Sequence, residues 1–140
     1  MLYAALNERG YFQPKVEHFH LRQLHSMFQG HPSMHNTPGL DMTSGSLGNG
    51  IAIGAGMAFA AKVQGKDYAT YVICGDGELQ EGVCWEGINM AAGRKLDNLV
   101  VFVDRNGWQS YKSVEFTVGQ KQHCRSIPRL WMAHPGNQWT

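Results

Sequence analysis

Two short apolar segments with a helical segment between them constrain this chain more than any other feature. Residues 71–74 (Y-V-I-C) and 99–103 (L-V-V-F-V) are typical of buried strands, and residues 81–94 between them are typical of a helix. Strands joined through a helix run parallel, because the helix returns the chain to the end of the sheet where the first strand began. The pattern predicts an α/β domain built on a parallel sheet.

Upstream of this unit the sequence predicts two more helices and a loop. Residues 1–9 indicate a helix that Gly10 ends, since glycine readily takes the left-handed conformation found there. Residues 16–28 have apolar side chains at mixed helical spacing and indicate a second helix. Residues 30–46 are rich in proline, glycine and histidine and indicate a loop. The first helix has no N-cap before it, so we expect a chain that is incomplete at its start.

Residues 47–63 indicate a helix of small residues. Each glycine inside a helix costs about 1 kcal/mol relative to alanine. We therefore expect close packing to offset the three glycines of this segment, Gly50, Gly54 and Gly56. Residues 111–140 have no helical period and one possible strand, at 114–118.

Charge and cysteine content exclude several classes of protein. The net charge is +1, from 12 basic and 11 acidic residues, so no electrostatic reason exists to expect nucleic acid or a membrane surface as partner. The longest apolar run, residues 51–61, is too short to span a bilayer. Three cysteines without a C-x-x-C pair argue against a disulfide framework or a zinc site and favour a reducing, cytoplasmic setting.

Polar turns follow both predicted strands. Gly75, Asp76 and Gly77 come after the first strand, and Asn106 follows the second. Because the carboxyl ends of parallel strands meet at one edge of a sheet, we expect Asp76 and Asn106 to lie side by side. Their carboxylate and amide oxygens are the ligands that Mg²⁺ prefers, together with waters and phosphates.

The surroundings of Asp76 suit a phosphate as well as a metal. Gly75 and Gly77 let the backbone approach an anion, and the helix that follows offers the positive end of its dipole. The residues alone predict a magnesium-bridged diphosphate. The alternative is an ordinary turn, because D-G and N-G are common hairpin dipeptides. A hairpin, however, needs its partner strand within a few residues, and here the next strand lies beyond a helix.

The same residues resemble a known family. A G-D-G turn followed about 30 residues later by a strand and an asparagine resembles the thiamine diphosphate motif. The segment G-D-G-E-L-Q-E-G is similar to transketolases, as are G-H-P at 30–32 and T-S-G-S-L-G-N-G at 43–50. The resemblance covers roughly residues 1–110 and leaves 111–140 as a divergent or unassigned tail. It implies the parallel-sheet fold of a transketolase N-terminal domain, incomplete at both ends.

The resemblance implies roles for individual residues. Asp76, Asn106 and the backbone carbonyl of Trp108 match the magnesium ligands. Other positions match contacts to the diphosphate, at Gly77 and Glu78, and to the cofactor rings, at Gly45 and Leu47.

Two further residues match positions outside the cofactor's diphosphate. His31 matches a histidine that contacts the substrate, and Glu81 matches a glutamate in a carboxylate network across the subunit interface. Glu81 can also be read as a first-turn helix residue that the dipole favours. A histidine metal site at 31 and 35 is disfavoured because no third ligand has a suitable spacing.

The implied activity is transfer of a two-carbon ketol unit between sugar phosphates. It requires thiamine diphosphate, Mg²⁺ and a partner subunit that carries a pyrimidine-binding domain, hence an oligomer. Two alternatives stay open. One is another thiamine diphosphate enzyme, such as the α chain of a 2-oxo acid dehydrogenase, which E-G-I-N-M-A-A also resembles. The other is a truncated, non-catalytic fragment that binds the cofactor only.

Overall fold

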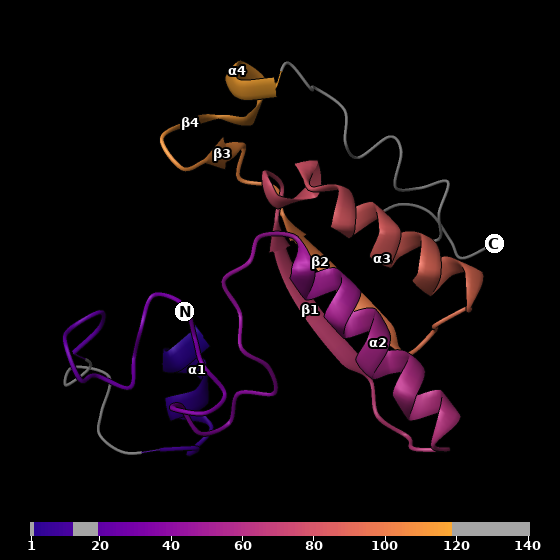
Figure 1. Ribbon diagram of the computed structural model, residues 1–140, viewed down its shortest axis with the longest axis horizontal. Coiled ribbons are helices and arrows are strands. Elements are labelled where there is room, and N and C mark those ends of the chain that lie inside the picture. The colour runs from indigo at the N-terminus through magenta and orange to yellow at the C-terminus, as the bar shows by residue number, and fades with distance from the viewer. Residues whose placement is uncertain (1, 13–19, 119–140) are drawn as a thin grey trace. The chain divides into compact units, whose positions relative to one another are not determined.

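The computed structural model describes residues 2–12 and 20–118, and the chain divides into two compact units, Met1–Ser46 and Leu47–Thr140. The described part of the first unit contains one helix, α1 (Leu2–Glu8). The second unit contains the sheet and the longer helices (Figure 1). Within the described residues, no helix combines the length and the apolar character needed to cross a membrane.

Helix α1 ends as the sequence predicts. Gly10 has a φ of +79°. Its N–H donates to the Asn7 carbonyl at 2.9 Å, and the Tyr11 N–H donates to the Leu6 carbonyl at 3.1 Å. These two hydrogen bonds satisfy carbonyls that the end of a helix leaves without partners. The helix packs through Tyr3 into an aromatic cluster with Phe12 and Phe28.

The predicted helix at residues 16–28 is wrong for the part that the structure describes. Residues 20–28 form turns, and residues 13–19 lie outside the described residues. Arg22 and His25 have positive φ values of 61° and 63°, which a right-handed helix does not contain. The Arg22 N–H donates to the Phe28 carbonyl at 2.8 Å, so the segment folds back on itself. Phe28 is buried. The backbone around it, however, is not helical, although the spacing of the apolar residues predicts a helix.

The second unit confirms the predicted parallel sheet. It contains α2 (Asn49–Val63), β1 (Thr70–Gly75), α3 (Gly82–Gly93) and β2 (Leu99–Asp104). The two strands are parallel, and their register runs from Thr70↔Leu99 to Gly75↔Asp104. The fold is therefore the α/β class that the two strands and their connecting helix indicate.

Both helices pack on one face of this sheet (Figure 1). The core between them is lined by Ile51, Cys74, Leu79, Cys84 and Ile88. The alternate strand residues on the other face, Tyr71, Ile73 and Phe102, are exposed. One face of the sheet thus supplies the core, which holds the carboxyl ends of β1 and β2 in place.

Close packing explains some of the helix glycines. A Cβ added to Gly54 would lie 2.4 Å from Val72 Cγ2, so only glycine allows this approach of α2 to β1. Gly50 would make an ordinary contact at 3.7 Å, and Gly56 has no neighbour within 4 Å. The expectation that all three are offset by packing is therefore wrong for Gly56. In α3, a Cβ on Gly87 would meet the backbone of Ala52 at 2.9 Å.

The predicted strand at residues 114–118 is also wrong. This segment is the short helix α4 (Val114–Val118), and it follows a small hairpin of β3 (Trp108–Gln109) and β4 (Lys112–Ser113). The Phe116 N–H donates to Ser113 Oγ at 3.2 Å, so Ser113 caps the start of the helix. The β-branched and aromatic residues of this segment are typical of a strand. The hydrogen bond to Ser113 instead stabilises the first turn of a helix. Residues 119–140 lie outside the described part of the chain.

Candidate diphosphate and magnesium site

Strand register brings the two polar turns to the same edge of the sheet. Gly75 pairs with Asp104 at the last position of the ladder. Immediately beyond it, the Asp76 N–H donates to the Asp104 carbonyl at 3.1 Å, and the Gly107 N–H donates to Asp76 Oδ2 at 2.8 Å. Asp76 is 7% exposed. A carboxylate that is nearly buried thus links the two segments that the sequence predicts to meet.

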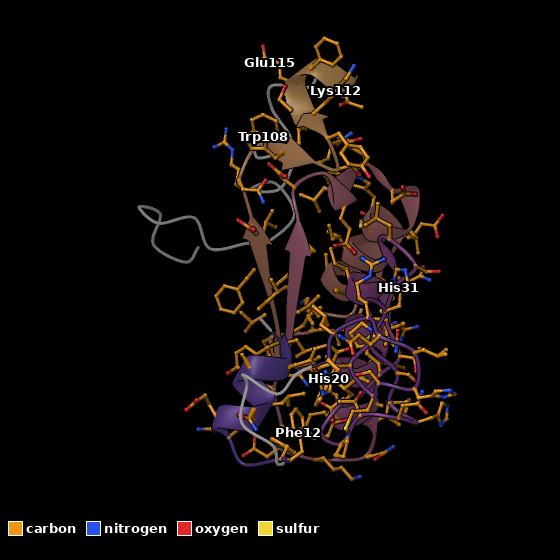
Figure 2. The ribbon with its side chains drawn as sticks, turned by 90° about the vertical axis from the view of Figure 1, so that its left-hand side faces the viewer. Phe12, His20, His31, Trp108, Lys112 and Glu115 are labelled. Carbon is orange, nitrogen blue, oxygen red and sulfur yellow. The ribbon has the colours of Figure 1, made fainter. Side chains whose placement is uncertain are left out.

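Asn106 lies in the second turn with its side chain exposed. Its Oδ1 accepts the Trp108 N–H at 2.7 Å, and its Nδ2 donates to Asp104 Oδ2 at 3.1 Å. Trp108 is on the hairpin beyond the carboxyl ends of β1 and β2, as is Lys112 (Figure 2). These hydrogen bonds fix the orientation of the Asn106 amide at the sheet edge.

The oxygens at this edge have the chemistry that a magnesium ion requires. Each Asp76 carboxylate oxygen accepts one backbone N–H, from Gly77 at 2.9 Å and from Gly107. An ionised carboxylate oxygen has two lone pairs, so each retains capacity for a metal. The Asn106 amide oxygen likewise accepts one hydrogen bond and has a second lone pair. The residues present therefore fit a hard cation that keeps several waters or phosphate oxygens.

The two glycines beside Asp76 have different surroundings. A Cβ on Gly75 would meet nothing within 4 Å, which leaves room for a ligand to approach the backbone. A Cβ on Gly77 would lie 2.7 Å from Gln109 Cβ. The Gln109 side chain in turn accepts a hydrogen bond from Gln80 Nε2. The hairpin therefore packs on Gly77, and free space remains beside Gly75.

Glu78 makes contacts that the sequence did not indicate. Its Oε1 accepts the Gly48 N–H at 2.8 Å, and its Oε2 accepts the Gly75 N–H at 3.3 Å. The residue begins a short 3₁₀ helix, η2 (Glu78–Gln80), and α3 starts only at Gly82. The predicted helix at residues 81–94 is thus confirmed as α3, and η2 lies between it and the G-D-G turn.

The other predicted site residues divide between the two units. In the first unit, His31 is exposed, and a Cβ on Gly45 would lie 2.6 Å from His31 Nδ1. Gly45 has a φ of +141°, which side chains rarely allow. Glycine is therefore needed at this position for its backbone conformation and to leave room for the His31 ring. In the second unit, Leu47 is 59% exposed, and Glu81 is the exposed N-cap residue of α3 without a side-chain capping hydrogen bond.

Two buried thiols lie behind the site. Burial, with the nearby Glu78 carboxylate, raises the pKa of Cys74 to about 12 and that of Cys84 to about 11. Cys84 Sγ donates to the Glu78 carbonyl at 3.2 Å. The thiolate is the reactive form of cysteine, so these groups are inert at neutral pH.

We expect neither thiol to react with Ellman's reagent in the folded chain at pH 8. At that pH, roughly one thiol in a thousand or fewer is ionised, given the raised pKa values. The measurement uses a Cys124→Ser background, since Cys124 lies outside the described residues. Unfolding in guanidinium should release two reactive thiols. Rapid labelling of the folded chain would contradict the burial of this core.

The fold and this edge define an α/β domain of the class that binds ligands at the carboxyl ends of parallel strands. Residues 1–132 match the family described as "Transketolase, thiamine diphosphate binding domain". The chain belongs to this family. The match confirms the resemblance to transketolase.

Individual relatives agree with the family. The chain is 42% identical over 132 residues to one subunit of the apulose-4-phosphate transketolase of Phocaeicola vulgatus, covering 94% of this chain and 45% of the relative. It is 43% identical over 108 residues to a 6-deoxy-6-sulfo-D-fructose transketolase subunit of a Clostridium species, covering 77% and 39%. A solved transketolase variant from Pichia stipitis superposes with a TM-score of 0.71 at 36% identity, covering 79% and 18%. The chain therefore spans less than half of the length of these relatives.

Proposed function

We propose that this chain is the diphosphate- and magnesium-binding part of a transketolase, which transfers a two-carbon ketol unit between sugar phosphates. The observation that supports this most directly is the 2.8 Å hydrogen bond from Gly107 to the Asp76 carboxylate. It joins the G-D-G turn to the asparagine turn, the two halves of the thiamine diphosphate motif. Family membership over residues 1–132 supports the same cofactor.

In this proposal Asp76, Asn106 and the Trp108 carbonyl would hold Mg²⁺, whose positive charge would offset the negative charge of a bound diphosphate. The free space beside Gly75 would leave room for the diphosphate. Thiamine diphosphate, when bound, supplies the carbon–carbon bond chemistry. The residues of the chain bind and orient it.

The remaining predicted roles complete the proposal. Gly77 and Glu78 lie along the diphosphate side, and Gly45 and Leu47 hold the rings. His31 contacts the sugar phosphate, and Glu81 takes part in an interface network.

We further propose a second subunit that carries the pyrimidine-binding domain. Relatives that are named as subunits of transketolases support a divided enzyme. The cytoplasm is the compartment that the cysteine content favours.

Calorimetric titration of thiamine diphosphate into the full chain tests the proposal, first with Mg²⁺ and then with a chelator. Binding that requires the metal is expected. Ketol transfer should then appear on addition of a pyrimidine-domain subunit. Cofactor binding without transfer under those conditions would favour the alternative of a non-catalytic fragment. A folded chain that binds no cofactor would overturn the proposal.

A further inference from the structure

We infer that Glu78 is a positioning residue that sets the distance between the segment before α2 and the G-D-G turn after β1. This inference rests on the proposed function, in which Leu47 holds the cofactor rings and the turn holds the diphosphate. The two carboxylate oxygens of Glu78 accept hydrogen bonds from both segments. Oε1 accepts the Gly48 N–H at 2.8 Å, and Oε2 accepts the Gly75 N–H at 3.3 Å.

The geometry of this link is restrained on the side of α2. Gly48 is the N-cap residue of α2, with a φ of +88° that favours glycine. A Cβ added there would lie 2.7 Å from both Glu81 Cβ and Val83 Cγ1. The segment therefore cannot shift toward α3. A carboxylate at this end of a 15-residue helix is also favoured by the helix dipole.

The link is also restrained on the side of the turn. Glu78 begins η2, and its carbonyl accepts the Cys84 thiol at 3.2 Å. The same thiol lies 3.6 Å from the Gly48 carbonyl. Cys84 is completely buried, so the backbone of both segments packs around one side chain. The Glu78 carboxylate is the polar bridge that spans them.

This bridge has a specific consequence for a ligand that contacts both segments. Such a ligand gains affinity from both contacts only when their separation is correct. A ligand that contacts the G-D-G turn alone does not depend on that separation. Removing the bridge should therefore reduce affinity for the whole cofactor more than affinity for its diphosphate part.

The test compares thiamine diphosphate with inorganic pyrophosphate in the full chain with Mg²⁺ present. Direct calorimetry gives the Kd of the cofactor, and displacement of the cofactor gives the Kd of pyrophosphate. In Glu78→Gln, a side-chain amide group faces one of the two N–H donors, so one hydrogen bond is lost. We expect the Kd of thiamine diphosphate to rise about tenfold and that of pyrophosphate to change less than about threefold.

Two further variants make the result interpretable. Glu86→Gln removes the same charge from the exposed surface of α3 and should leave both Kd values unchanged. Glu78→Asp keeps the charge but shortens the reach, and it should reproduce the selective loss if Glu78→Gln does not fold. A role in stability alone would not change the ratio of the two Kd values.

The outcomes separate this inference from the proposed function. Equal losses for both ligands, or no loss for either, would overturn the positioning role while the wild-type chain still binds the cofactor. Failure of the wild-type chain to bind thiamine diphosphate would overturn the proposed function and this inference with it.

Discussion

Replacing Asp76 by asparagine is expected to weaken magnesium-dependent binding of thiamine diphosphate by at least about 100-fold. The carboxylate supplies the only negative charge that we assign to the metal, and a neutral amide binds Mg²⁺ poorly. Asparagine has nearly the same size, and its amide oxygen can still accept the Gly107 or the Gly77 N–H. Calorimetry with Mg²⁺ and with chelator measures the effect, and thermal unfolding shows whether the variant is folded.

Asp97→Asn is the matched control for this prediction. Asp97 lies just before β2, at the opposite end of the strand from Asp104, and its 2.6 Å ion pair with Lys62 is on the surface. Surface ion pairs contribute little to stability, so this variant should bind the cofactor like the wild type. If Asp76→Asn also binds like the wild type, Asp76 is not a metal ligand.

Replacing Gly87 by alanine should destabilise the chain by about 3 kcal/mol. The new Cβ would lie 2.9 Å from the Cα and the N of Ala52 in α2. Backbone atoms inside a helix cannot rotate aside, so α2 and α3 would have to separate and open the core at Ile51 and Ile88. Guanidinium unfolding followed by circular dichroism measures the loss.

Gly56→Ala gives the opposite result in the same experiment. Gly56 lies in the interior of α2, and an added Cβ would meet nothing within 4 Å. Alanine is favoured over glycine in a helix, so the variant should be more stable by up to about 1 kcal/mol. Equal effects of the two substitutions would contradict the packing of α2 on α3.

The pattern of apolar residues along the chain was sufficient to predict much of the second unit. The strands at residues 71–74 and 99–103 and the helix between them were all confirmed. A buried strand is recognised by its continuous apolar residues, and parallel pairing follows from the helix that joins the two strands. The end of α1 at Gly10 was predictable for a similar reason, because glycine favours the left-handed conformation required there.

The same kind of pattern failed where a local hydrogen bond or turn competed with it. Residues 20–28 fold into turns through positive φ values at Arg22 and His25. Residues 114–118 form a helix because the Ser113 hydroxyl caps it. Apolar spacing reports burial, and in short segments burial does not distinguish a helix from a strand or a turn.

The fold class and the meeting of Asp76 with the asparagine turn could be predicted from the amino-acid sequence, because both follow from two parallel strands that end at one edge. The groups that surround this edge could not be predicted, because they come from segments that are distant in the chain. Glu78 reaches Gly48, 30 residues away, and Gln109 packs on Gly77. Such contacts depend on how α2 and the hairpin pack against the sheet. The periodicity of apolar residues along the chain does not indicate which distant residues meet in this way.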